Sequence, residues 1–345
     1  MIYVFCGLPS PHAMFAARLG VDIFRERFRD YHYIVANTLD QLRDGLAQRG
    51  ERHALLYFDV PDEKICQSIV KHGIPTVLIV EPVEQAVLYS MQARSLSVLE
   101  ALRFVSQSAS ALFPIASSET IVPLRLGTHS AELETLISRI SLSLGFSLTS
   151  QNVQNILALY GQAEGAKIRP LAEIIDERIE HAIEARSSAS KLTKGERELI
   201  SAAASNYDPL MSGESVQRIT WPVAMCLSGE KPHHGLNGPV DMTGPARAIS
   251  FGPYMHLPSG VWRAEVTFSV EKNFSGNSIV VDVLADGEIA VLGKSPLPTS
   301  GSFTVQLEFE VTRPHVPLEV RTFIGTGAIE GEFELVDVTL VRLDP

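Results

Sequence analysis

The chain has 345 residues, of which 45% are hydrophobic and 20% are charged. This composition is typical of globular protein and excludes a disordered or collagen-like chain, and the length predicts two domains. With 29 Lys and Arg against 40 Asp and Glu, the formal net charge is −11, so no basic excess is present to bind nucleic acid.

The first half of the sequence alternates short apolar runs with stretches of helical periodicity. Strands are predicted at residues 2–6, 33–35, 53–58 and 76–80, each separated from the next by a helix-length segment. This alternation indicates a parallel sheet joined by right-handed crossovers. Apolar residues at helical spacing predict further helices over residues 133–144 and 171–183. We therefore expect an α/β domain over residues 1–212, with a three-layer parallel sheet and a helical cover.

After Trp221 the sequence changes to an alternation of period two. Strands are predicted at residues 262–268, 279–285, 289–292, 304–311, 318–324 and 333–341. Turn residues such as Asp286-Gly287 separate them. The alternation slips in phase near Val336, which predicts a β-bulge there. We therefore expect an all-β sandwich with a jelly-roll topology over residues 213–345.

The cysteines and the hydropathy of the chain bear on disulfides, metal sites, secretion and membrane insertion. Three cysteines without C-x-x-C spacing indicate neither a disulfide framework nor a thiolate metal site, so we expect no metal. The apolar N-terminus has no basic region, and Pro9 and Pro11 interrupt it, so no signal peptide is predicted. No run approaches the ~20 apolar residues of a membrane-spanning helix. We expect a cytoplasmic protein without a membrane span.

The loop between the first strand and the first helix is where chemistry is expected. A helix N-terminus presents unpaired N–H groups and partial positive charge, which together favour an anion such as phosphate. The candidate cofactor-binding residues are Gly7, Pro9, Ser10 and His12. The loop contains no Lys, and Pro9 and Pro11 lack an N–H, so it offers a phosphate few donors. His12 is the candidate catalytic residue, as a general base.

The order of segments over roughly residues 1–210 resembles the P-loop sulfotransferases, which move a sulfuryl group from 3′-phosphoadenosine 5′-phosphosulfate to a hydroxyl or amine. The family's first loop reads P-K-[SC]-G-T-[TS], and residues 9–14, PSPHAM, stand in its place. Its second signature, R-D-P-x-[DE]-x-x-x-S, resembles residues 80–88, VEPVEQAVL. The resemblance implies a P-loop-type sheet and, in an active enzyme, that nucleotide as cofactor.

Of the family's first-loop pattern only Pro9 matches, and three of the departures in the two signatures concern ligands of the nucleotide. Ser10 stands where the family has Lys, Val80 where it has Arg, and Leu88 where it has Ser. The pocket implied by the resemblance therefore lacks cations that the donor's phosphates need. Because each charge-assisted hydrogen bond contributes about 1.5–3 kcal/mol, we expect donor binding to be lost with them. We expect no cofactor, and 3′-phosphoadenosine 5′-phosphosulfate only if the protein is an active enzyme.

The second half carries its own resemblance. Residues 251–263, FGPYMHLPSGVWR, are similar to the motif G-P-Y-x-x-L-x-x-G-x-[YW] of jelly rolls appended to bacterial carbohydrate-active and polysaccharide-biosynthesis proteins. The resemblance implies a glycan or polysaccharide as partner. Trp221, Tyr254 and His256 are the candidate glycan-binding residues, because their rings can stack on a sugar; a packing role for each stays open.

These patterns leave three hypotheses from different functional classes. The first is a pseudoenzyme, a degenerate sulfotransferase-like protein whose sandwich recognises a glycan in the assembly or modification of a bacterial surface polysaccharide. The second is an active sulfotransferase with a glycan acceptor. The third is a structural protein that oligomerises with copies of itself through the edge of the sandwich.

Overall fold

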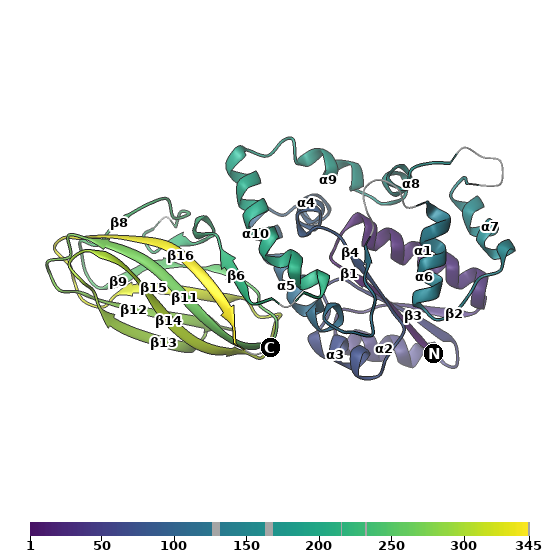
Figure 1. Cartoon of the computed structure of the whole chain (residues 1–345), viewed down its shortest axis with the longest axis horizontal. Coiled ribbons are helices and arrows are strands. Elements are labelled where there is room, and N and C mark those ends of the chain that lie inside the picture. Colours follow the sequence, from purple (N-terminus) through teal and green to yellow (C-terminus); the bar gives the residue numbers. More distant parts are fainter. Residues whose placement is uncertain (126–131, 163–167, 215, 232, 344–345) are drawn as a thin grey trace. The chain divides into compact units, whose positions relative to one another are not determined.

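The computed structural model of the chain describes residues 1–125, 132–162, 168–214, 216–231 and 233–343 (Figure 1). The chain divides into two compact units. The first, the α/β unit, comprises residues 1–193 and 208–214, and the second, the β-rich unit, comprises residues 194–207 and 215–345. The helix α10 (Lys194–Ser212) contributes residues to both units, and the predicted boundary at residue 212 stays a prediction.

The described part of the α/β unit contains a parallel sheet in the order β2-β3-β1-β4-β5. Its strands are β1 (Ile2–Gly7), β2 (Tyr31–Val35), β3 (His53–Phe58), β4 (Thr76–Val80) and β5 (Leu124–Arg125). Its other helices are α1 (Pro11–Phe28), α2 (Leu39–Arg49), α3 (Glu63–Lys71), α4 (Val83–Ala93), α5 (Val98–Ala116), α6 (Leu133–Ser143), α7 (Ser150–Leu159), α8 (Leu171–Arg178) and α9 (Ala182–Ser188). The prediction of a parallel α/β sheet is confirmed.

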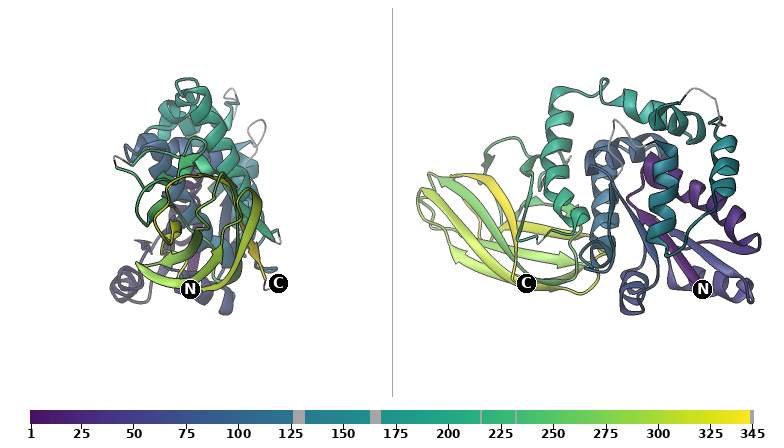
Figure 2. Two further views of the ribbon diagram at one scale, coloured as in Figure 1. Left: turned by 90° about the vertical axis from the view of Figure 1, so that its left-hand side faces the viewer. Right: turned by 45° about the vertical axis from the view of Figure 1, so that its right-hand side comes forward.

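The crossovers of this sheet change direction at its central strand. The chain leaves β1 toward β2 at one edge, whereas it leaves β3 and β4 toward the opposite edge. Because parallel crossovers are right-handed, α1 lies on one face and α2 and α3 lie on the other (Figure 2). The helices α6, α7 and α8 pack against α1, and buried rings such as Phe5, Phe15 and Phe24 fill the core between them and the sheet.

One helix prediction is wrong in its extent. The helix expected over residues 171–183 is two helices, because α8 ends at Arg178 and α9 begins at Ala182. His181 lies between them with a φ of 64°, a left-handed conformation that interrupts the helical hydrogen bonds. Ile179 and Ala182 are buried on either side of the break, so the apolar spacing continues through it and hides it.

The β-rich unit holds two antiparallel sheets, in the orders β13-β12-β15-β9-β7, with β10 beside β15, and β14-β11-β16-β6, with β8 beside β16. The strands are β6 (Arg218–Trp221), β7 (Leu227–Ser228), β8 (Val240–Asp241), β9 (Arg247–Phe251), β10 (Pro253–Met255), β11 (Gly260–Glu271), β12 (Ser278–Ala285), β13 (Glu288–Pro296), β14 (Gly301–Val311), β15 (Leu318–Ile324) and β16 (Glu332–Arg342). A short 3₁₀ helix spans Val223–Met225. This layout is the predicted β-sandwich.

The predicted alternation and bulge are confirmed in detail. Trp262, Ala264, Val266 and Phe268 on β11 are fully buried, while Arg263, Glu265 and Thr267 face the other side of the strand. Thr267 pairs with Asp337 and Phe268 pairs with Leu335, which leaves Val336 as the extra, exposed residue of the bulge. The bulge in this central strand pair therefore follows from the sequence pattern of β16.

Candidate functional site

The carboxyl end of the parallel sheet is the first place to look for a site. The chain leaves the neighbouring strands β1 and β4 in opposite directions, and ligands of open α/β sheets bind at such a switch point. The loop after β1 supplies Ser10 and His12, and Glu81 directly follows β4. Glu81, about 70 residues further along the chain, therefore meets Ser10 and His12 at this edge.

Ser10 is the N-cap of α1 and is almost fully buried. Its Oγ accepts a hydrogen bond from the backbone N–H of Ala13 at 3.1 Å and donates one to Oε2 of Glu81. The Nδ1 of His12 contacts Oε1 of the same carboxylate, outside the angular range of a hydrogen bond. The Glu81 side chain is only 3% exposed and is the centre of this cluster. In the sequence, Glu81 lies within residues 80–88 and was not singled out as a site residue.

Gly7 and Pro9 complete the predicted loop, and Gly7 has a structural reason to be glycine. A Cβ at position 7 would lie 2.8 Å from the carbonyl oxygen of Ile79 and 3.1 Å from the Cβ of Ala13. The missing side chain therefore lets β1 and the start of α1 pack closely against β4. Pro9 is buried and donates no N–H. Cofactor binding by these residues stays a prediction.

The residues at this edge do not fit a phosphosulfate nucleotide. Two of the cations that could replace the missing Lys and Arg are otherwise placed: Arg18 donates to the carbonyl of Arg178 at 3.1 Å, and Lys71 ends α3 at the opposite edge of the sheet. Arg125 pairs with Val80 in register and lies at the correct edge. An exposed cation such as Arg125 beside the buried Glu81 carboxylate is a poor match for a polyanion.

A second group of polar side chains lies along the same edge and was missed by sequence analysis. Asn37 follows β2 and Asp59 follows β3, and the amide of Asn37 donates to Oδ1 of Asp59 at 3.0 Å. Arg94 reaches Oδ2 of Asp59 at 3.5 Å. The Tyr57 hydroxyl is buried without a hydrogen-bond partner, and burial together with the nearby Asp59 raises its pKa well above its ordinary value. The sequence signal for this group was the presence of a polar residue, Asn37 or Asp59, shortly after each of two predicted strands.

The helix that follows β4 also begins at a carboxylate. Oδ1 of Asp208, from the end of α10, accepts a hydrogen bond from the backbone N–H of Val83 at 2.7 Å. Burial raises the pKa of Asp208 above 3.8, and the bond from Val83 opposes this shift. The folded state therefore holds this proton more tightly than the unfolded chain does.

That shift predicts the pH dependence of the Asp208→Asn variant. Because the folded pKa is raised, the contribution of Asp208 is most favourable below about pH 4 and is lost as the pH rises through its folded pKa. Asn keeps an acceptor for Val83 and has no charge to bury. We expect the variant to gain thermal stability relative to the parent as the pH rises from 4 to 7, measured by far-UV circular dichroism of the helices. If the thermal stabilities of the variant and the parent change in parallel between pH 4 and 7, the prediction is contradicted.

Two of the three predicted glycan-binding residues are buried, which corrects that prediction. Trp221 is 1% exposed, and its Nε1 donates to the hydroxyl of Tyr207 at 3.2 Å. His256 is 5% exposed, and its backbone carbonyl accepts a hydrogen bond from the same hydroxyl at 2.8 Å. Neither ring has a free face for a sugar. Tyr254 is partly exposed, and its role stays a prediction.

Tyr254 leads to a cluster on β12 and β15 that sequence analysis missed. Its hydroxyl donates to Oε1 of Glu319 at 3.0 Å. Arg321, two residues further along β15, donates from Nε and Nη2 to the two oxygens of Asp282 at 2.8 and 2.7 Å. The guanidinium carbon of Arg321 also lies 5.0 Å from the centre of the Phe323 ring. We call these five residues the β12–β15 face.

The register shows that the strand residues of this cluster share one side of the sheet. Asp282 pairs directly with Arg321, and Val280 pairs with Phe323. The residues between them, such as Val281 and Thr322, are fully buried on the opposite side, in the core of the unit. The β12–β15 face therefore carries an aromatic ring and oriented charged groups away from the core. Its signal in the sequence is one charged residue in the middle of each of two apolar strands.

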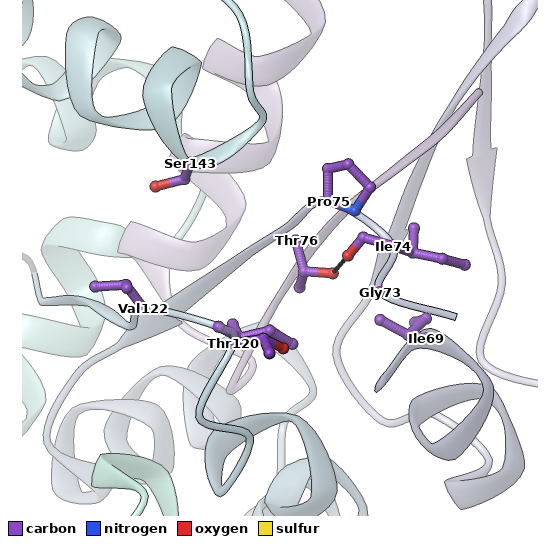
Figure 3. Close-up of a pocket in the computed structure, with 9 residues that line it drawn as sticks. Ile69, Gly73, Ile74, Pro75, Thr76, Thr120, Val122 and Ser143 are labelled. Carbon is purple, nitrogen blue, oxygen red and sulfur yellow. Dashed lines mark hydrogen bonds between the residues drawn. The ribbon is translucent and has the colours of Figure 1, made fainter. Parts of the chain in front are cut away.

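A pocket of about 180 Å³ lies at the amino edge of the parallel sheet (Figure 3). Gly73, Ile74, Pro75, Thr76 and Val122 contribute to its lining, and the Thr76 hydroxyl donates to the carbonyl of Ile74 at 2.7 Å. The pocket contains no charged side chain among its lining residues. It offers little chemistry and stands apart from the groups described above.

Among the residues that the structure describes, no group of three or more His, Cys, Asp and Glu side chains is arranged to hold a metal ion. No helix in the described ranges combines the length and apolar character that crossing a membrane requires.

No known protein family and no curated protein sequence matches the chain. Among solved structures, an arabinose-bound α-L-arabinofuranosidase, MgGH51, has 10% identity and a TM-score of 0.23, over 29% of this chain and 18% of its own. TmCBM61 in complex with β-1,4-galactotriose has 16% identity and a TM-score of 0.23, over 36% of this chain and 87% of its own. The C-terminal CBM6 of LamC from Zobellia galactanivorans has 14% identity and a TM-score of 0.20, over 34% and 98%. With such low scores, the fold assignment rests on the sheet topology itself.

Proposed function

We propose that the β-rich unit recognises a glycan through the β12–β15 face, and that the α/β unit is a degenerate, non-catalytic sulfotransferase-like domain of P-loop type. The sandwich is then of the jelly-roll kind, and the protein acts in the assembly or modification of a surface polysaccharide. The observation that carries the glycan proposal is the combination of a half-exposed aromatic ring with charged groups whose orientation is fixed by their partners.

The chemistry of this face suits a sugar. A pyranose presents C–H groups that pack on an aromatic ring and hydroxyls that both donate and accept hydrogen bonds. Phe323 and Tyr254 supply rings, while Glu319 and Arg321 supply an acceptor and donors. Asp282 is 3% exposed and holds Arg321 in a two-pronged ion pair, so the guanidinium is ordered before a ligand arrives. That order reduces the entropy lost on binding.

The test is a glycan array with the full chain, followed by the Phe323→Ala variant against a matched control. Phe274 is 74% exposed elsewhere on the same unit, so Phe274→Ala removes an equivalent ring. We expect Phe323→Ala to weaken retention of the bound glycan by at least about tenfold, on the scale of 1–2 kcal/mol for one stacking ring, and Phe274→Ala to leave it unchanged. Equal effects of the two variants would contradict the assignment.

The other two hypotheses predict different results in two further measurements, a thermal-shift titration and sedimentation. An active sulfotransferase would be stabilised by micromolar 3′-phosphoadenosine 5′-phosphate in a thermal-shift titration. A structural protein would bind no glycan and would sediment as an oligomer, held by unpaired edges such as those of β13 and β14. A monomer that binds glycan and is not stabilised by the nucleotide supports the proposal.

A further inference from the structure

The α/β unit contains two carboxylates at the positions where a parallel sheet of this kind would receive an anion. Helices α1 and α4 both begin at the carboxyl edge, directly after the neighbouring strands β1 and β4. The N–H groups and the dipole at each N-terminus favour negative charge there. Glu81 lies against the first turn of α1, and Asp208 lies against the first residue of α4.

Each carboxylate uses the groups that an external anion would need. At α1, Glu81 accepts the hydroxyl of Ser10 on one oxygen and contacts His12 with the other, and the Ser10 hydroxyl in turn takes the N–H of Ala13. At α4, Asp208 takes the N–H of Val83 at 2.7 Å. Pro11 has no N–H to offer. The hydroxyl of Ser10 and the N–H groups of Ala13 and Met14 are therefore already in use.

We infer that Glu81 and Asp208 are built-in substitutes for a bound anion, and that they close the switch point of the α/β unit to phosphate and sulfate groups. We expect Glu81 to exclude an anion more strongly than Asp208 does. Its side chain is 3% exposed, so a second negative charge beside it would have to be buried as well. The inference is independent of glycan binding, because none of these residues belongs to the β12–β15 face. It explains why the loop keeps the form of an anion site without its cations.

The test measures inorganic sulfate binding by isothermal titration calorimetry in the parent and in Glu81→Gln. The variant keeps the size of the side chain and an acceptor for Ser10 but loses the charge. We expect no saturable binding to the parent at millimolar sulfate and at least tenfold tighter binding to Glu81→Gln. Glu51→Gln, an exposed position between α2 and β3 at the amino edge of the sheet, is the matched control and should behave like the parent.

Two results would overturn the inference. One is tight sulfate binding to the parent that Ser10→Ala abolishes, which would make the loop a true anion site. The other is a folded Glu81→Gln that gains no sulfate affinity over Glu51→Gln, which would show that the carboxylate does not exclude sulfate. If Glu81→Gln does not fold, Asp208→Ala tests the inference at α4, because it leaves the N–H of Val83 without its acceptor. Tighter sulfate binding to Asp208→Ala than to the parent would support the inference, and unchanged sulfate binding would contradict it.

Discussion

Replacing Arg321 with Ala should lower the unfolding free energy of the β-rich unit by about 3 kcal/mol, because it leaves the buried Asp282 carboxylate without a counter-ion. Asp282 is 3% exposed and would lose two hydrogen bonds, of 2.8 and 2.7 Å. We place the effect at the lower end of the range for buried pairs because Arg321 is itself 26% exposed. Both tryptophans, Trp221 and Trp262, belong to this unit, so urea unfolding followed by their fluorescence reports on it.

Two controls separate the buried charge from a general loss of surface charge. Lys272 and Glu332 form an exposed pair on the same unit, and Lys272→Ala should leave the unfolding transition nearly unchanged. The double variant Asp282→Leu with Arg321→Met removes both charges and should recover most of the stability. It should nevertheless lose glycan binding. If the single variant behaves like Lys272→Ala, the ion pair does not organise the β12–β15 face.

Elements whose residues face one environment along their whole length were predicted well. The strands at residues 53–58 and 76–80 coincide with β3 and β4, because a central parallel strand is buried on both sides and appears as an unbroken apolar run. The bulge at Val336 was predictable because one extra residue reverses the alternation of every residue that follows it. In these cases local pattern and tertiary burial agree.

The candidate sites were only partly predictable, because their partners are distant in the sequence. Ser10 and His12 were correctly placed at the start of a helix after the first strand. Their contact with Glu81 depends on β1 and β4 being neighbours, and β4 is the fourth strand of the chain. The pairing of Asp282 with Arg321 likewise requires the register of β12 and β15. A pattern along one sequence carries no register between strands that a third element separates.

For Trp221 the prediction failed in a different way. The residue type suggested glycan binding, whereas the side chain lies in the core of the β-rich unit. The rings of tryptophan serve equally in stacking on a sugar and in filling a core, so only burial distinguishes the two roles. Trp221 is the last residue of the short strand β6 and pairs with Val338 on β16. Such a short strand gave too few alternating positions for its buried side to be recognised.

The Trp221→Ala variant should therefore affect stability and not glycan recognition. It removes a ring that is 1% exposed and leaves the hydroxyl of Tyr207 without the indole donor, at a cost of about 3–5 kcal/mol in the unfolding free energy of the β-rich unit. The measurement is urea unfolding followed by the fluorescence of Trp262. Glycan binding, measured well below the thermal midpoint of the variant, should keep the parental dissociation constant.

Tyr254→Ala provides the reciprocal case, because Tyr254 is partly exposed and contributes its hydroxyl to Glu319 at 3.0 Å on the β12–β15 face. We expect it to weaken glycan binding by at least about tenfold while it changes the unfolding free energy far less than Trp221→Ala does. If Trp221→Ala abolished binding while the β-rich unit remained folded, the sugar would have to reach the buried indole through a rearrangement of that unit. The β12–β15 face would then not be the binding surface.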